Sequence, residues 1–271
     1  MTFPYKAVFV DLDGTLFAPE GKLTQVTKET LLKLHKAGIP VVVTTGRPMD
    51  LVESHFKDFP HLGPVSTLNG AVVYEGFGKE PHVFTKGLEH SLVPELLNAP
   101  KTQELSTCIL SETVDIQYTF PFCTVPEEFG DAHPKTTKVI ASPEDLPHEP
   151  CLSILIHNED ESKRVQLTEE FRKLYGNSAN VINYHNWPWM EVSPTDVCKG
   201  YSMEYICKNY LGISHTDVIA FGDNSNDLEM LKEAGMGVAM ENASDAVKAV
   251  SNEQTVSCQE NGVAVYLNKL L

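Results

Sequence analysis

The chain has 271 residues, more than one domain usually contains, so its length favours two compact units or one large α/β domain. Hydrophobic residues make up 42% of it and charged residues 21%, which excludes a disordered or fibrous protein. The 37 acidic and 21 basic residues give a formal charge of -16, which repels phosphate backbones and anionic lipid surfaces. We therefore expect no nucleic-acid partner, and a phosphorylated substrate would need a local cation to hold it.

The first elements alternate strand, helix and strand. Residues 7–10 form a short apolar run that ends at Asp11, the pattern of a strand buried on both faces of a parallel sheet. Thr24 can cap a helix that Gly38 ends, and residues 39–43 form a second buried strand. A strand–helix–strand unit of this kind is parallel and right-handed in nearly all known proteins. The buried face of the helix is predicted to contain Val26, Thr30, Leu34 and Ala37.

A β-hairpin is predicted next. Apolar runs at 64–68 and 71–74 flank Asn69 and Gly70, a dipeptide typical of a tight two-residue turn. Turn geometry alone explains this dipeptide, although Asn69 could also reach a functional site from the tip of the hairpin. Both interpretations remain open.

From about residue 82 the composition and the hydrophobic pattern of the chain change. Prolines become frequent, and strand-like runs at 116–122 and 152–157 accompany one charged helix near 160–175. We therefore predict that residues 85–188 form an inserted α+β domain. Its aromatic side chains could stack on a substrate, but they fit core packing as well. They are Tyr118, Phe120, Phe122, His185, Trp187 and Trp189.

The strand and helix alternation returns after Glu191. A helix over about 200–211, a buried strand at 218–221, a helix from Asn226 and a short strand at 237–240 follow one another. The fold class is therefore α/β, with a doubly wound parallel-sheet core and an inserted α+β domain. The core domain is predicted to comprise residues 1–84 and 189–271.

Cysteine spacing and apolar runs indicate the compartment. The six cysteines contain no C-x-x-C pair, which favours reduced structural thiols over a disulfide framework or a zinc site. No apolar run approaches the length of a membrane span, and the first residues lack a signal-peptide core. We expect a cytoplasmic protein without membrane contact, and the sequence carries no signal for its oligomeric state.

Polar clusters follow three of the predicted strands, where ligands of doubly wound sheets bind. If these strands are neighbours, the carboxylates of Asp11, Asp13, Asp223 and Asp227 converge on one spot. Like charges so close raise one another's pKa, so a hard cation such as Mg²⁺ is the natural compensation. The alternative is that each aspartate is a turn residue or a helix cap. The spacing excludes a calcium loop, and neither G-x-x-x-x-G-K-[ST] nor G-x-G-x-x-G occurs.

Four ordered motifs resemble the haloacid dehalogenase superfamily, and specifically its Cof-type phosphatases. They are Asp11-x-Asp13-Gly14-Thr15, Thr45-Gly46-Arg47 after a hydrophobic strand, Lys199-Gly200, and Gly222-Asp223-x-x-Asn226-Asp227. The resemblance covers the whole predicted core, and the insert lies where that subfamily places its cap domain. It implies a Rossmann-like core, an aspartyl-phosphate intermediate and a Mg²⁺ cofactor.

The resemblance also implies roles for individual residues. Asp11 would attack phosphorus and ligate Mg²⁺. Asp13 would be the general acid and then the base, with its backbone carbonyl facing the metal. Relatives that take phosphate from ATP carry Thr at this position, so Asp13 argues against an ion pump. Lys199 would neutralise the phosphoryl group and brace Asp11, although taken alone it could be a solvated surface lysine.

The remaining site residues surround the phosphoryl group or the metal in this interpretation. Asp223 would be the second side-chain metal ligand, and Asp227 would orient water or Lys199. Arg47 could approach the substrate, contact the cap or pair with an acidic neighbour. The predicted phosphate-binding residues are Leu12, Thr45, Gly46, Lys199 and Asn226, and Asn69 is a further candidate.

The function that follows is Mg²⁺-dependent hydrolysis of small phosphorylated metabolites, with sugar phosphates as the expected class. A mobile cap would exclude water and select the substrate. Two rivals stay open. One is a phosphomutase or phosphotransferase on the same core, and the other is a metabolite-binding regulator that has kept the fold without catalysis.

Overall fold

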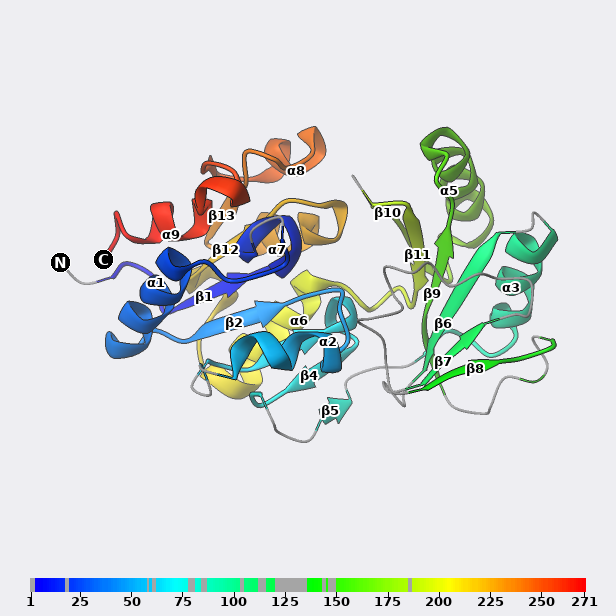
Figure 1. The fold of residues 1–271 in the computed structure, drawn as a ribbon, viewed down its shortest axis with the longest axis horizontal. Coiled ribbons are helices and arrows are strands. Elements are labelled where there is room, and N and C mark those ends of the chain that lie inside the picture. The colour runs from blue at the N-terminus through cyan, green and yellow to red at the C-terminus, as the bar shows by residue number, and fades with distance from the viewer. Residues whose placement is uncertain are drawn as a thin grey trace. The chain divides into compact units, whose positions relative to one another are not determined.

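The computed structural model describes residues 3–17, 20–57, 59, 62–77, 81–83, 87–102, 105–111, 116–119, 136–142, 145, 150–184 and 187–271. The chain divides into two compact units, each with its own sheet (Figure 1). We call them the core unit and the inserted unit. The core unit comprises Met1–Arg47, Val52–Phe84 and Cys198–Leu271, and the inserted unit comprises Pro48–Leu51 and Thr85–Val197.

The core unit contains an eight-stranded sheet, parallel except for its last hairpin strands. From one edge to the other the strands are β14 (Glu253–Gln254), β13 (Met236–Ala239), β12 (Val218–Gly222), β1 (Ala7–Val10), β2 (Val41–Thr44), β3 (Val65–Thr67), β4 (Val72–Tyr74) and β5 (Pro81–Val83). All four residues of β1 are buried, as a continuous apolar run in the middle of a parallel sheet requires. The predicted parallel core is therefore confirmed.

Strand β1 lies where the order of the strands reverses. It pairs in parallel with β12 on one side and with β2 on the other. Loops that leave the carboxyl ends of two such strands diverge to opposite faces and open a crevice between them. This arrangement brings the segments after β1, β2 and β12 to one edge of the sheet.

Helices cover both faces of the core sheet (Figure 1). Right-handed crossovers that lead away from β1 in opposite directions place their helices on opposite faces. Helix α1 therefore lies on one face, where it contacts α9, and α7 lies on the other, where it contacts α6 and α8. The helices are α1 (Gln25–Lys36), α2 (Asp50–Glu53), α6 (Lys199–Ile206), α7 (Leu228–Glu233), α8 (Asp245–Val250) and α9 (Gly262–Leu267).

Helix α1 starts where the sequence predicted, because the side chain of Thr24 accepts a hydrogen bond from the backbone of Thr27. Its buried face differs from the prediction by part of a turn. Val26 is 48% exposed, whereas Thr27 and Leu31 are buried beside Thr30 and Leu34. A threonine at a helical core position weakens the apolar pattern from which the face was predicted.

The hairpin between β3 and β4 is confirmed, but its turn is longer than two residues. Thr67 pairs with Val72, so four residues connect the strands. Three of them, Leu68, Asn69 and Gly70, have positive φ angles of 49°, 54° and 103°. Left-handed backbone at Leu and Asn is uncommon, and such strain collects at functional sites.

The inserted unit contains a six-stranded, mostly antiparallel sheet with two described helices, α3 (Leu92–Thr102) and α5 (Glu161–Tyr175). Ile109, Ile154, Met190 and Phe171 belong to the buried cluster that joins the sheet to α5. The strands in order are β10 (Asn180–Asn183), β11 (Trp189–Ser193), β9 (Cys151–His157), β6 (Ser106–Ser111), β7 (Ile116–Thr119) and β8 (Thr136–Val139).

Strand β11 belongs to this second sheet, where it pairs with β9 and β10. The inserted unit thus extends to Val197, beyond the boundary at residue 188 that the sequence pattern predicts. Trp189 is 1% exposed and packs within the unit. Phe120, Phe122, His185 and Cys123 lie outside the described residues.

The sequence predicts reduced cysteines and no membrane-spanning segment, and the described residues bear on both predictions. Cys108, Cys151, Cys198, Cys207 and Cys258 are all free thiols. Among the described helices, none combines the length and the hydropathy that crossing a bilayer requires.

Candidate active site

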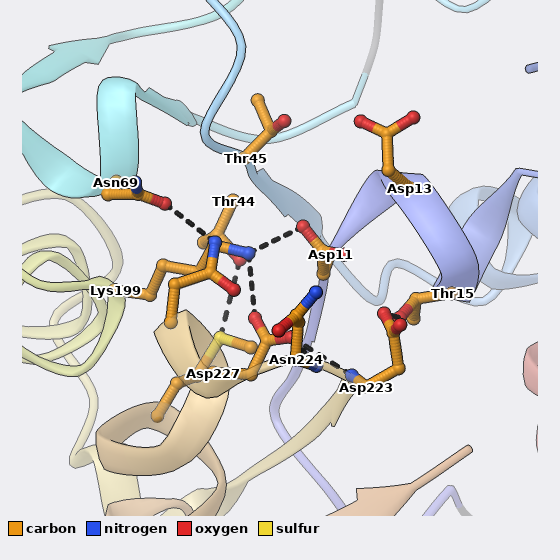
Figure 2. A network of polar contacts seen from close by, with 12 residues as sticks. Asp11, Asp13, Thr15, Thr44, Thr45, Asn69, Lys199, Asp223, Asn224 and Asp227 are labelled. Carbon is orange, nitrogen blue, oxygen red and sulfur yellow. Dashed lines mark hydrogen bonds and ion pairs between the residues drawn. The ribbon is translucent and has the colours of Figure 1, made fainter. Parts of the chain in front are cut away.

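Three side chains of the predicted motifs lie at the ends of three adjacent strands. Asp11 follows β1, Thr45 follows β2 and Asp223 follows β12. The backbone N–H of Asp11 donates to the carbonyl of Phe221 at 3.1 Å, so β1 and β12 stay paired up to the site. The strands are neighbours, which is the condition that the sequence left open, and Figure 2 shows the group from close by.

Lys199 lies at the centre of the cluster and is 0% exposed. Its Nζ donates to Asp11 Oδ1 at 2.5 Å and to Asp227 Oδ1 at 2.7 Å. Burial disfavours the ammonium charge, but the two carboxylates outweigh burial and raise the pKa of Lys199 above its usual range. Lys199 is therefore a buried cation between two carboxylates, and not a solvated surface lysine.

Close backbone packing places Lys199 there. It is the first residue of α6, and the preceding Cys198 caps the helix by accepting from Tyr201 N. A Cβ at Gly70 would lie 2.7 Å from the Cys198 carbonyl, so the hairpin turn packs directly against the start of α6. A Cβ at Gly200 would lie 2.8 Å from that of Glu229 on α7. Glycine at both positions lets α6 approach its neighbours closely.

Asp227 ties this lysine to the loop after β12. One oxygen accepts from Lys199, and the other accepts from the backbone N–H groups of Asp223 (2.9 Å) and Asn224 (3.0 Å). Its side chain is fully buried, and a Cβ at Gly222 would lie 2.5 Å from its carboxyl carbon. Both oxygens of Asp227 thus already orient Lys199 and the loop, as expected of a residue that acts through its neighbours.

Asp223 lies against the first motif. Its Oδ1 accepts from Thr15 Oγ1 at 2.8 Å, and its Oδ2 contacts the side-chain nitrogen of Asn242 at 3.4 Å. A Cβ at Gly14 would lie 2.4 Å from Asp223 Oδ2, and Gly14 has a φ of +78°. Only glycine fits there. Burial first, and then the neighbouring charge of Asp227, raises the pKa of Asp223 to about 7, despite the hydrogen bond from Thr15.

The donor set fits a hard divalent cation. One carboxylate oxygen from each of Asp11, Asp223 and Asp227 can be chosen so that all three lie within 4.8 Å of one another. Burial and the neighbouring aspartates raise the pKa of Asp11 well above its usual range, although Lys199 opposes this. A cluster of buried carboxylates that cannot all ionise unaided is the environment that Mg²⁺ stabilises through oxygen ligands.

Asp13 does not join this group, which corrects the prediction that four carboxylates converge. Its side chain is 51% exposed and points away from the other aspartates (Figure 2). Arg47 holds both of its oxygens, with Nη2 to Oδ1 at 2.6 Å and Nε to Oδ2 at 2.7 Å. The guanidinium carbon lies 5.7 Å from the centre of the Phe17 ring. Of the three options for Arg47, the structure contains the pairing with an acidic neighbour.

The predicted phosphate-binding residues differ in what they can offer a ligand. Thr45 Oγ1 accepts from Arg47 N at 3.1 Å and donates to none of the described residues. Asn69 is 1% exposed, and its N–H donates to the Thr45 carbonyl at 2.9 Å. Gly46 touches Asn69, since a Cβ at Gly46 would lie 3.3 Å from Asn69 Oδ1. Leu12 has a fully buried side chain, so only its backbone can contact a ligand.

Asn226 joins Asn69 to the loop after β12. Its Nδ2 donates to Asn69 Oδ1 at 2.8 Å, which brings the hairpin tip into the site and not merely into a turn. Asn226 is 7% exposed, and its Oδ1 has no hydrogen-bond partner among the described residues. A buried acceptor without a donor costs free energy, so this oxygen is suited to a bound water or ligand.

Sequence reasoning missed two residues of the site. The hydroxyl of Thr15 fixes Asp223, and Asn242 contacts both Gly14 and Asp223. Thr15 belongs to the first motif, but no role follows from its place there. Asn242 is a polar residue shortly after β13, so the rule that ligands gather at the carboxyl ends of parallel strands was a usable signal.

Comparison with known proteins identifies a family and similar phosphatases. The family profile of haloacid dehalogenase-like hydrolases matches residues 8–267. The 5-amino-6-(5-phospho-D-ribitylamino)uracil phosphatase of Bacillus subtilis (strain 168) is 32% identical over 276 residues, covering 99% of this chain and 98% of the relative.

Solved structures show the same fold. A haloacid dehalogenase-like hydrolase from Bacteroides thetaiotaomicron matches with a TM-score of 0.79 and 26% identity over 98% of this chain and 100% of its own. A haloacid dehalogenase-like hydrolase from B. subtilis has a TM-score of 0.82 at 24% identity, with 98% and 100% coverage, and supports the fold alone.

Proposed function

The chain belongs to the haloacid dehalogenase-like hydrolases and is a phosphatase, and we propose that it is a Mg²⁺-dependent, Cof-type phosphomonoesterase acting on small phosphorylated metabolites. The observation that carries the proposal is the buried contact of Lys199 with Asp11 beside Asp223, at the ends of adjacent strands. This arrangement combines an attacking carboxylate, a fixed cation and oxygen ligands for a metal.

Asp11 is the nucleophile in this proposal. Its Oδ1 accepts from Lys199, whereas its Oδ2 accepts from no described residue and is available to attack phosphorus. The P–O bond to the leaving alcohol breaks as the bond to Asp11 forms, and water then hydrolyses the aspartyl-phosphate. The covalent intermediate divides one difficult hydrolysis into two easier displacements, in which the Asp11 carboxylate is first the nucleophile and then the leaving group.

Charge neutralisation comes from the chain and from the metal. Lys199 has three protons on Nζ, of which Asp11 and Asp227 take two, and the third can bind a phosphoryl oxygen. The free hydroxyl proton of Thr45 can bind another. Asp11 and Asp223 would hold Mg²⁺, with the Asp13 carbonyl as a further ligand implied by the resemblance. When bound, the ion neutralises phosphoryl charge in the transition state.

Asp13 would protonate the leaving alkoxide and then activate water. Arg47 now holds both oxygens of Asp13, so at least one of these hydrogen bonds has to break during turnover. The arriving phosphoryl group carries negative charge and can compete for the guanidinium. Half-exposure of Asp13 leaves room for that movement.

We expect Asp13→Asn to slow hydrolysis of alkyl phosphates by about 10² to 10⁴. Activated aryl phosphates should lose much less, because their leaving groups depart without a proton. The ratio kcat/KM on a hexose phosphate and on an aryl phosphate measures the difference, because it reports formation of the aspartyl-phosphate and not its hydrolysis. Asp217→Asn is the matched control, because Asp217 also forms an ion pair, with Lys6 at 2.8 Å. Asp217 and Lys6 precede β12 and β1, whereas Asp223 and Asp11 follow these strands at their opposite ends. Equal losses on both substrates would contradict the acid role.

A substrate panel read out as free phosphate tests the activity itself. It should contain hexose phosphates, pentose phosphates and 5-amino-6-(5-phospho-D-ribitylamino)uracil, the substrate named for the 32%-identical relative. We propose a small phosphorylated polyol or sugar as the preferred class. Phosphate release without an isomeric sugar phosphate supports hydrolysis. Accumulation of an isomer would indicate a mutase, and no turnover of any ester would indicate a regulator.

Turnover should stop in EDTA and return when Mg²⁺ is added in excess. The physical reason is that the carboxylates of Asp11 and Asp223 repel an incoming phosphoryl group unless a cation lies between them. The measurement is the initial rate on the best substrate of the panel, with unfolding temperature recorded in EDTA as the control for integrity. Undiminished activity in EDTA would remove the metal from the proposal.

A further inference from the structure

Asn242 contacts two loops of the site from outside the four motifs. It lies three residues after β13, and its Nδ2 donates to the Gly14 carbonyl at 2.8 Å and contacts Asp223 Oδ2 at 3.4 Å. Its Oδ1 accepts from the backbone N–H of Cys258 at 3.0 Å. A backbone N–H can only donate, so the oxygen of the amide must face Cys258. The NH₂ group therefore faces Gly14 and Asp223.

The side chain of Asp223 is held from both of its oxygens. Thr15 donates to Oδ1, and Asn242 lies against Oδ2. Its backbone is fixed as well, because its N–H donates to Asp227 and its carbonyl accepts from Ser244 N at 3.1 Å. Rotation of the side chain is the freedom that remains, and Thr15 and Asn242 limit it.

Gly14 and Asp223 pack directly against each other, and Asn242 contacts both. The carboxylate lies so close to Gly14 that a Cβ there would be 2.4 Å from Oδ2. The short bond from Asn242 to the Gly14 carbonyl keeps the first motif in this contact. Since Cys258 anchors the amide from the C-terminal segment, three separate parts of the core unit meet at this one side chain.

We propose that Asn242 is a positioning residue that sets the affinity of the site for the divalent cation. This inference rests on the proposed function, since it concerns Asp223 as a metal ligand. A hard cation needs its carboxylate oxygens in place before it binds, and partners that orient the ligands typically contribute 10- to 100-fold in metal affinity. Asn242 acts on Asp223 directly and on the first motif through Gly14.

The test is the Mg²⁺ dissociation constant of the whole protein, measured by calorimetry without substrate. We expect Asn242→Ala to raise it by about 10- to 100-fold. Activity of this variant should recover at high Mg²⁺, because lost affinity can be offset by concentration whereas a damaged fold cannot. Thr15→Val removes the other hydrogen bond to Asp223, and the two changes should combine non-additively, since both act on one carboxylate.

Asn252→Ala is the matched control. Asn252 Oδ1 accepts from the backbone N–H of Gly237 at 2.7 Å. Asn252→Ala therefore removes a hydrogen bond to a backbone N–H, as Asn242→Ala does at Cys258, but it removes no contact with Asp223. Its Mg²⁺ affinity should stay at the wild-type value. If Asn242→Ala does not fold, Asn242→Ser is the variant measured, with the same expectation. A folded Asn242 variant with wild-type affinity would overturn the inference. Wild-type protein that binds no Mg²⁺ would overturn the proposed cofactor and, with it, this inference.

Discussion

Asp11→Asn is expected to abolish turnover and to leave the fold intact. Asparagine has the shape of aspartate but cannot form the phosphoryl bond, and removing the nucleophile of a covalent enzyme costs about 10⁶ in kcat. The folded state should not suffer. Burial raises the pKa of Asp11, so a neutral side chain relieves a charged cluster, and Lys199 keeps Asp227 as its partner.

Two measurements check this expectation. Free phosphate from the best substrate gives the residual rate, and the thermal unfolding midpoint in EDTA gives the stability, which should equal or exceed that of the wild type. Asp217→Asn, which also removes one carboxylate from an ion pair, should keep full activity. Substantial turnover by a folded Asp11→Asn protein would refute the role of Asp11.

Lys199→Met should have the second largest effect, on stability and on activity together. Methionine can occupy the volume of the buried stem, but Asp11 and Asp227 lose the ammonium that each contacts. Breaking a buried ion pair from one side costs about 3–5 kcal/mol, because it leaves charge without compensation. The rate should also fall by roughly 10² to 10³, the cost of removing one fixed donor to the transition state.

Chemical denaturation in EDTA measures the loss of stability, and kcat at saturating Mg²⁺ measures the loss of rate. Lys6→Met is the matched control, because Lys6 forms a 2.8 Å ion pair in which its side chain is 61% exposed, so little should change. Adding Asp227→Asn to Lys199→Met should restore part of the stability by removing one orphaned carboxylate. A Lys199→Met protein as stable as the wild type would contradict the claim that Lys199 stabilises the buried carboxylates of Asp11 and Asp227.

The convergence of Asp11, Thr45 and Asp223 could be predicted from sequence for a physical reason. Each follows a mostly apolar strand of four or five residues, and neighbouring parallel strands have their carboxyl ends at one edge of the sheet. The prediction required one condition, that these strands are neighbours, and the structure meets it. It did not need the positions of side chains.

Side-chain direction could not be predicted in the same way. Asp13 is two residues from Asp11, yet Arg47 draws its carboxylate out of the cluster. The place of Asn242 after β13 could have marked it as a candidate, but its contacts could not be predicted, because its three partners are separated from it in sequence and include two backbone groups. Such contacts depend on tertiary packing, for which residue spacing carries no signal.

The boundary of the inserted unit shows a related limit. Residues 189–193 form β11, a strand that was not predicted, and residue pattern alone does not say which sheet a strand joins. They fall within the predicted core, whereas β11 pairs with β9 and β10. The four-residue turn after Thr67 was missed because Asn-Gly is typical of a shorter one.

The central claim is that Asp11 carries the phosphoryl group during turnover. The most direct measurement is an acid quench of wild-type and Asp13→Asn protein during reaction with an activated aryl phosphate, whose leaving group needs no proton, and Mg²⁺. Mass spectrometry of the peptide that contains Asp11 follows. We predict a phosphoryl group on Asp11, and more of it in Asp13→Asn, which lacks the base that activates water. An Asp11 peptide that stays unmodified while phosphate is released would contradict the account.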